Sequence, residues 1–190
     1  MVATTSTRER LVEVATGLLE EGGPSAVTLR EVGHRAGVSH NAPYKHFADK
    51  EDLLAAVAAA QLRANRATVQ HLSGGRPPGE ALRLVLHAYV SRAMEHPEMF
   101  RLIYGRWRTD SAELGQAAHE ARSLLVSLVQ AAQDSGDLPP GDPDRMTALL
   151  QALAHGAADL ALSGHLAKDG KGHAEPGDLV DDLLARLATT

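Results

Sequence analysis

Apolar residues recur every three to four positions along nearly the whole of this 190-residue chain. The clearest case is the stretch 7–21, in which Leu11, Val14, Leu18 and Leu19 fall on one face of an α-helix. We find no segment with the strict apolar–polar alternation that is typical of a half-buried β-strand. The periodicity therefore predicts an all-α protein.

Glycine and proline clusters divide this pattern into about nine helices. Ser6 with Glu9 and Thr28 with Glu31 have the spacing of capping boxes, which mark helix starts. The predicted helices span about 7–21, 28–36, a short third helix that Ser39 caps, 49–72, 80–95, 97–107, 111–134, 142–163 and 177–188. We interpret the chain as a three-helix head within residues 1–54, followed by a connecting helix and helical body within residues 55–190.

The amino-acid composition restricts the classes of structure and function that the chain can have. The 32 alanines and only six aromatic residues favour helices. The absence of cysteine excludes disulfides, thiolate catalysis and cysteine-ligated metals. No segment resembles a membrane span or a secretory signal, so we expect a cytoplasmic protein. The net charge of −5 lies outside the first fifty residues, which carry six acidic and six basic residues. A site that binds a polyanion is therefore expected in the head rather than in the more acidic remainder of the chain.

Two short helices joined at Gly37 form the pattern of a helix-turn-helix. The chain must reverse within three or four residues there, and glycine tolerates the positive φ that such a turn requires. Leu29, Val32, Ala36 and Phe47 are spaced to hold these helices against the first helix. The third helix would then present its polar face to solvent.

Residues 28–54, TLREVGHRAGVSHNAPYKHFADKEDLL, closely resemble the DNA-binding signature of TetR-family transcriptional regulators. The matching features are the Thr-x-x-Glu start, the Ala-Gly-Val-Ser turn, the Tyr-x-x-Phe ending and the Asp-Lys-Glu-x-Leu that follows. The resemblance implies a homodimer that binds double-stranded DNA at a near-palindromic operator. It also implies a repressor that dissociates from its operator when a small-molecule effector binds to it.

The resemblance places the third helix in the major groove, which is wide enough for an α-helix. Asn41 can then contact adenine in bidentate fashion, and Ala42 can touch a thymine methyl group. Tyr44, Lys45 and Lys50 suit phosphate contacts, as does the helix start at Thr28. The predicted DNA-binding residues are Thr28, Ser39, His40, Asn41, Ala42, Tyr44, Lys45, His46 and Lys50.

For residues 55–190 the resemblance implies an effector pocket and a dimer interface built from the last two long helices. The candidate pocket residues are His87, Met94, Met99, Phe100, Ile103, Tyr104, Trp107, His119, His155 and Asp159. The candidate interface residues are Ala148, Ala152, Ala158, Leu179, Leu183 and Leu187. The run 149–164 also resembles the His-Gly segment of the WHG type of C-terminal domain, although that type's tryptophan is not evident before His155.

Other functions stay open. The same fold can act as an activator, or without any effector. His155 and Asp159, four positions apart on one helix, suggest a helical metal-binding protein as a further alternative. We find no spacing of catalytic residues, so we do not expect an enzyme, and we expect neither a cofactor nor a resident metal.

Overall fold

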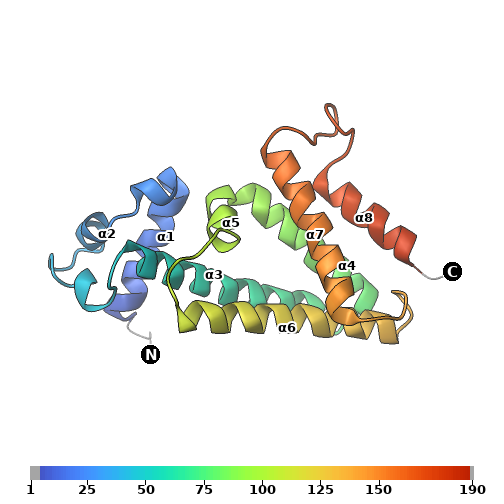
Figure 1. Cartoon of the computed structure of the whole chain (residues 1–190), viewed down its shortest axis with the longest axis horizontal. Coiled ribbons are helices and arrows are strands. Elements are labelled where there is room, and N and C mark those ends of the chain that lie inside the picture. The colour runs from blue at the N-terminus through green and yellow to red at the C-terminus, as the bar shows by residue number, and fades with distance from the viewer. Residues whose placement is uncertain (1–4, 189–190) are drawn as a thin grey trace. The chain divides into compact units, whose positions relative to one another are not determined.

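The computed structural model describes residues 5–188, and these residues are helical apart from turns and one isolated β-bridge between Ala167 and Gly172. The α-helices labelled in Figure 1 are α1 (Thr7–Ala26), α2 (Leu29–Arg35), α3 (Lys50–Ser73), α4 (Pro78–Glu95), α5 (Pro97–Ile103), α6 (Ala112–Asp134), α7 (Pro143–Leu162) and α8 (Pro176–Leu187). A short 3-10 helix, η1 (Pro43–Lys45), lies between α2 and α3. The predicted all-α class is confirmed. No helix within 5–188 is both long and apolar enough to cross a membrane.

The first helix begins and breaks where its sequence predicts. The Glu9 backbone N–H donates to Ser6 Oγ at 3.2 Å, and the Ser6 N–H donates to Glu9 Oε2 at 2.7 Å, which completes the capping box. Gly22 and Gly23 leave the helical conformation, and Gly23 has a φ of 66° that favours glycine. The helical stretch after this kink is a single turn, so the effective end of the long helix is near residue 21.

Contacts divide the chain into two compact units, which we describe separately. Unit 1 contains the residues up to Ala64 together with Glu98–His119, and unit 2 contains Asn65–Pro97 together with the residues from Glu120 onward. α3 and α6 each contribute residues to both units. The predicted boundary between a DNA-binding domain, residues 1–54, and a second domain, residues 55–190, is a functional division. It stays a prediction.

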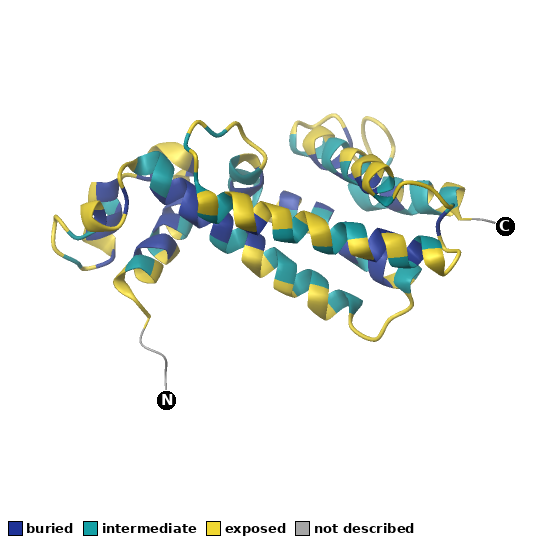
Figure 2. Cartoon of the chain, turned by 60° about the horizontal axis from the view of Figure 1, so that its bottom comes forward, coloured by how far each residue is buried: buried dark blue, intermediate teal, exposed yellow. Residues whose placement is uncertain are grey.

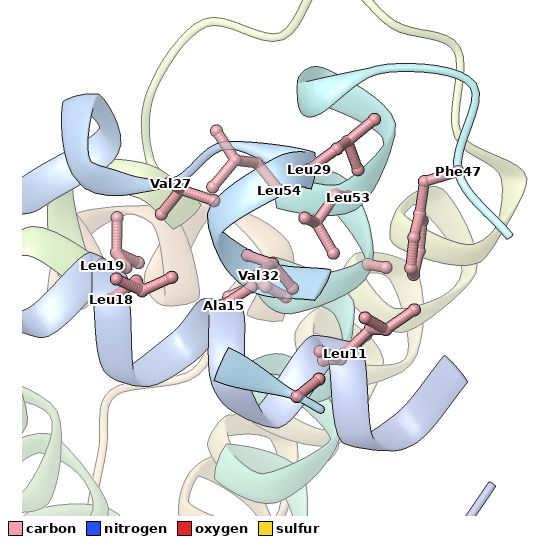
Figure 3. Close-up of a cluster of buried hydrophobic side chains, with 14 of the residues drawn as sticks. Leu11, Ala15, Leu18, Leu19, Val27, Leu29, Val32, Phe47, Leu53 and Leu54 are labelled. Carbon is pink, nitrogen blue, oxygen red and sulfur yellow. The ribbon is translucent and has the colours of Figure 1, made fainter. Parts of the chain in front are cut away.

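A buried apolar cluster holds unit 1 together, and Figure 3 shows its central side chains. Leu11 and Leu19 of α1, Val32 of α2 and Leu53 of α3 are fully buried in it. Phe47, which follows η1, is also buried there. α2 has only seven residues and would not persist alone, so burial against this cluster is what stabilises the helix-turn-helix.

Unit 2 is built around α4, α7 and α8, which pack against one another. Its core contains Leu82 of α4, Val129 of α6, Leu150 of α7 and Val180 of α8, all buried. Figure 2 shows buried and exposed residues alternating along the helices, as expected for amphipathic segments.

A polar cluster links α4 to α8 at the surface of unit 2. Arg83 Nε and Nη2 donate to the two oxygens of Asp181 at 2.7 and 2.9 Å, and His87 Nε2 donates to Asp181 Oδ1 at 2.7 Å. The hydrogen bonds from Arg83, and then the one from His87, lower the pKa of Asp181 from 3.8 to about 2. The ionised carboxylate is therefore favoured in the folded state.

We expect Asp181→Asn to destabilise the protein at neutral pH by less than about 1 kcal/mol, because the ion pairs are largely solvent-exposed. A carboxyl group with a lowered folded-state pKa contributes stability above its unfolded pKa, near 3.8, and loses it as the pH falls through about 2. Urea unfolding of both proteins between neutral pH and pH 2 would check this. A difference between the two proteins that stays constant across that range would contradict the assignment.

Candidate DNA-binding site

The segment between α2 and α3 presents most of the predicted base-reading residues. We call residues 39–46 the recognition segment. Gly37 has a φ of 65°, as the predicted turn requires, and the recognition segment follows directly. Its side chains are exposed except those of Ala42, which is half-buried, and Pro43, which is buried, and Figure 2 shows this stretch mainly in the exposed colour. Tyr44 is 52 % exposed.

The predicted short third helix is present as the 3-10 helix η1, flanked by turns. The recognition segment consists of turns and η1, and Ser39 makes no side-chain cap there. Pro43 has no backbone N–H, so it cannot donate to the Ser39 carbonyl as an α-helix would require. That carbonyl instead accepts from Ala42 N at 2.9 Å, and Lys45 N donates to Ala42 O at 3.2 Å, both in the 3-10 pattern.

Gly33 of α2 makes room for the proline that anchors the recognition segment. A Cβ atom at position 33 would lie 2.8 Å from Pro43 Cγ and 3.4 Å from its Cδ, far inside normal contact distance. The Pro43 carbonyl in turn accepts from His46 N and Phe47 N, both at 3.0 Å. The close packing of Gly33 on Pro43 therefore fixes the backbone that carries Asn41 and Tyr44.

We expect Gly33→Ala to destabilise unit 1 by about 1–3 kcal/mol, because the proline ring is rigid and must shift to avoid the methyl group. The double variant Gly33→Ala/Pro43→Ala should recover much of that loss. Gly17→Ala is the matched control, because a Cβ there would meet nothing within 4 Å and alanine favours a helix. Chemical unfolding of the four proteins measures the effect. Equal stability of the Gly33→Ala and Gly17→Ala variants would exclude the packing argument.

One cation of the head, Arg35, is held by two carboxylates. Arg35 donates to Glu21 at 2.6 Å and to Glu31 at 2.9 Å, first Glu21 and then Glu31 raising its pKa. Lys45 is exposed and Lys50 half-buried, and neither forms an ion pair with any residue that the structure describes. These two ammonium groups are therefore available for phosphate.

Thr28 is the N-cap residue of α2, as the sequence predicts. Its Oγ1 accepts from Glu31 N at 3.1 Å, but Glu31 turns to Arg35 rather than completing a capping box. A threonine hydroxyl that accepts a hydrogen bond still has its own proton to donate. Thr28 is exposed, so that proton can reach an external acceptor.

The predicted pocket residues divide between the units. In unit 1, Met99, Ile103 and Trp107 pack on the buried cluster, and the Phe100 and Tyr104 rings lie 5.2 Å apart. Met99 and Phe100 are buried, Ile103 and Trp107 are half-buried, and Tyr104 and His119 are exposed.

In unit 2, His87 bonds to Asp181, and His155 Nδ1 lies 3.0 Å from the Tyr89 hydroxyl, in hydrogen-bond contact. Met94 is 41 % exposed, and Asp159 is exposed. No group of three or more potential metal-ligating side chains occurs within residues 5–188. The assignment of these residues to an effector pocket stays a prediction.

One face of α7 exposes leucines and small residues, together with the charged Arg145 and Asp159. We call Ala148, Leu149, Ala152, Gly156 and Leu160 the α7 face. Leu149 is 49 % exposed and Leu160 46 % exposed, and the space where a Cβ of Gly156 would stand is open. Ala148 and Ala152 are exposed beside them.

The other predicted interface residues differ from the α7 face. Ala158 is fully buried within unit 2, so it lies on the inner side of α7 and cannot add area to an interface. Leu183 and Leu187 of α8 are half-buried against the core of unit 2, and Leu179 is half-buried as well. Whether any of these residues contact a second subunit stays a prediction.

Sequence reasoning missed a second set of contacts in unit 1. Arg8 of α1 and Arg63 of α3 donate to the two oxygens of Glu113 of α6, at 2.5 and 2.8 Å. Burial alone would raise the pKa of Glu113, but the bonds from Arg63 and Arg8 outweigh it and lower that pKa. Arg8 also lies over the Phe47 ring, 5.2 Å from its centroid. No local spacing in the sequence signals contacts between residues so far apart.

Two family models match the chain. The model described as "Bacterial regulatory proteins, tetR family" matches residues 11–57. The model described as "Tetracyclin repressor-like, C-terminal domain" matches residues 82–187, more than half of the chain.

Three further proteins match most of the length of the chain. A solved protein of unknown function from Rhodococcus sp. RHA1 is 32 % identical with a TM-score of 0.82, covering 99 % of this chain and 98 % of that one. A TetR/AcrR-family transcriptional regulator from Thermobifida fusca, 22 % identical, has the same fold with a TM-score of 0.70 and 96 % coverage of both chains. The HTH-type transcriptional regulator BetI from Burkholderia cenocepacia is 28 % identical over 82 % of this chain and 94 % of that protein.

Other curated relatives match over shorter stretches. The chain spans about a third of the length of the HTH-type transcriptional regulator YerO from Bacillus subtilis, at 25 % identity. The family and these relatives are transcriptional regulators rather than enzymes. With its N-terminal signature, its helical architecture and both family models in agreement, the chain belongs to the TetR family of DNA-binding transcriptional regulators.

Proposed function

We propose that the protein is a homodimeric repressor that binds a near-palindromic operator in the cytoplasm and leaves it when a small-molecule effector binds. The observation that carries this proposal is the recognition segment. It exposes polar and basic side chains. Its backbone is held by the buried residues Pro43 and Phe47 and by the close packing of Pro43 on Gly33. A rigid, exposed, polar segment suits the reading of a DNA groove.

Base reading is assigned to the start of the recognition segment. Asn41 can donate to and accept from the edge of adenine, while Ala42 can contact a thymine methyl group. His40, whose ring lies 6.0 Å from that of Tyr44, can donate to guanine or to phosphate, and Ser39 and His46 flank these contacts. Sequence discrimination comes from these base contacts rather than from the phosphate contacts.

Phosphate contacts are assigned to four groups around the recognition segment. Tyr44 and Lys45 lie on it, Lys50 begins α3, and Thr28 caps the start of α2. These contacts hold the recognition segment in register on the duplex. Because residues 1–50 carry no net charge, we expect weak non-specific binding and a shallow dependence on salt.

The α7 face supports a dimer. Exposed leucines beside small residues allow two copies of α7 to approach closely, with α8 alongside. A two-fold dimer presents two recognition segments, and their spacing on DNA would be about 34–36 Å or a multiple of it. The operator would then be a near-palindrome.

Release by an effector requires two states of the dimer that differ in the spacing of the recognition segments. An effector shifts the balance only by the difference in its affinity for the two states. α3 is suited to transmit the change, because it begins beside the recognition segment and also contributes residues to unit 2. The predicted effector contacts in unit 2 include His87, His155 and Asp159.

The test is selection of duplexes from a random DNA library by the purified full-length protein. We expect a near-palindrome to be enriched. A panel of small molecules then identifies any compound that lowers operator affinity and binds the protein directly. Enrichment of a single half-site would contradict the dimer. Enrichment without release by any compound, from protein freed of bound molecules by refolding, would contradict control by an effector.

A further inference from the structure

Unit 1 contains an open pocket of about 640 Å³, whose lining includes two of the predicted site residues, Lys50 and Trp107. The first turns of α3, the helix α5 and the segment that follows α5 form its walls, and Pro24 closes one side. Its volume lies within the range of small-molecule sites, about 300–1,000 Å³. We propose that this pocket binds an amphipathic organic anion, which means an apolar body with one carboxylate, sulfonate or phosphate group.

The apolar part of the pocket is formed by Leu54, Leu102 and Trp107. Leu102 and Trp107 are only partly buried, and their inner sides pack on the buried cluster of unit 1. They are therefore held in place from behind while part of their surface faces the pocket. A ring or short chain of a ligand would cover this apolar surface and remove it from water.

The acidic residues of the pocket are already engaged. Glu51 Oε1 accepts from the Arg108 backbone N–H at 2.8 Å, and Glu98 Oε1 accepts from Arg101 Nη1 at 2.6 Å. Asp49 Oδ1 accepts from the Asp52 backbone N–H at 2.9 Å and so caps α3. Each of these three carboxylates therefore already has a hydrogen-bond donor within the protein.

Two cations of the pocket remain free for a ligand. Lys50 and Arg106 both line it, and neither forms an ion pair with any residue between 5 and 188. The Arg108 side chain is 90 % exposed and lies 3.8 Å from Glu51, so it adds a third, loosely held positive charge. An anionic group would thus meet several cations next to an apolar wall, which gives the class of ligand.

The pocket also bears on DNA binding, and this part rests on the proposed function. Lys50 lines the pocket and is also one of the predicted phosphate contacts. An anion bound there would occupy the ammonium group and place a negative charge near the DNA backbone. Binding of the anion is therefore expected to lower operator affinity, independently of any effector in unit 2.

Trp107 provides the readout, because it is the chain's only tryptophan and it lines the pocket. The full-length protein is titrated with 8-anilinonaphthalene-1-sulfonate, and in parallel with its uncharged counterpart N-phenyl-1-naphthylamine. We expect saturable quenching of Trp107 with a clear preference for the sulfonate. Arg106→Gln should weaken sulfonate binding by about fivefold, as expected for a solvent-exposed ion pair, and leave binding of the uncharged dye unchanged.

Arg145→Gln is the matched control, because Arg145 is also exposed and unpaired within the described chain but lies on α7, outside the pocket. Equal sulfonate affinity in the wild type and Arg106→Gln would overturn the proposal. So would a loss of operator affinity in Arg106→Gln without dye, since that would assign Arg106 to the DNA backbone. If no protein binds any duplex, the proposed function fails, while the Trp107 titration still decides the anion site.

Discussion

Replacing Tyr44 and Lys45 together by alanine is expected to abolish measurable operator binding while the fold stays intact. Both side chains are exposed, and Lys45 has no ionic partner in the part of the chain that the structure describes. A hydrogen bond to a charged group contributes at least about 1 kcal/mol. Four such contacts are lost per dimer, so we expect a loss of about 4 kcal/mol, or roughly 1,000-fold in affinity. Fluorescence anisotropy with the selected duplex measures it.

Lys168→Ala provides the control for this experiment, since Lys168 is an exposed lysine in the segment between α7 and α8. Its operator affinity and the melting temperatures of both variants should match those of the wild type. Wild-type affinity in the Tyr44→Ala/Lys45→Ala protein would show that the recognition segment does not contact the DNA backbone.

The second large effect concerns the α7 face. Ala152→Glu is expected to convert the proposed dimer into monomers, because position 152 lies between the exposed Leu149 and Leu160. A two-fold interface would bury two unpaired carboxylates close to each other. Leaving a buried charge unpaired costs roughly 3 kcal/mol or more, which weakens association by at least about 100-fold. Sedimentation velocity over a range of concentrations measures the change.

Ala118→Glu is the matched substitution, because Ala118 is another exposed alanine within a long helix, α6. It should leave the oligomeric state unchanged, and both variants should unfold at the wild-type temperature. A dimer that tolerates glutamate at position 152 as well as at position 118 would place the interface elsewhere.

The helix pattern could be predicted because its signals are local. Glycine and proline punctuation, the capping residues Ser6 and Thr28, and the spacing of apolar residues are all visible within a few positions. The exception was the recognition segment, where a proline and its packing partner Gly33 are ten positions apart. The missing N–H of Pro43 is visible in the sequence, but the packing of Pro43 on Gly33 is a tertiary contact that the sequence alone does not show.

Contacts between distant residues could not be predicted in the same way. Glu113 joins Arg8 and Arg63, and Glu51 holds the backbone at Arg108, through pairs separated by 50 to 105 positions. A single sequence shows that these residues are charged but not which ones meet. For the same reason, Trp107 was predicted as a pocket residue without the other residues that line its pocket. Nor does the sequence show that Ala158 is buried within unit 2 while Ala152 of the same helix is exposed.

The composition of α3 has a mechanical consequence. Its 24 residues contain neither glycine nor proline, which are the residues that most often kink a helix. The helix therefore behaves as a stiff rod about 36 Å long. A rotation of about 5° at one end of such a rod displaces the other end by roughly 3 Å, close to the 3.4 Å rise of one base pair. A very small rearrangement among the helices of unit 2 would therefore suffice to move Lys50 out of register with a phosphate.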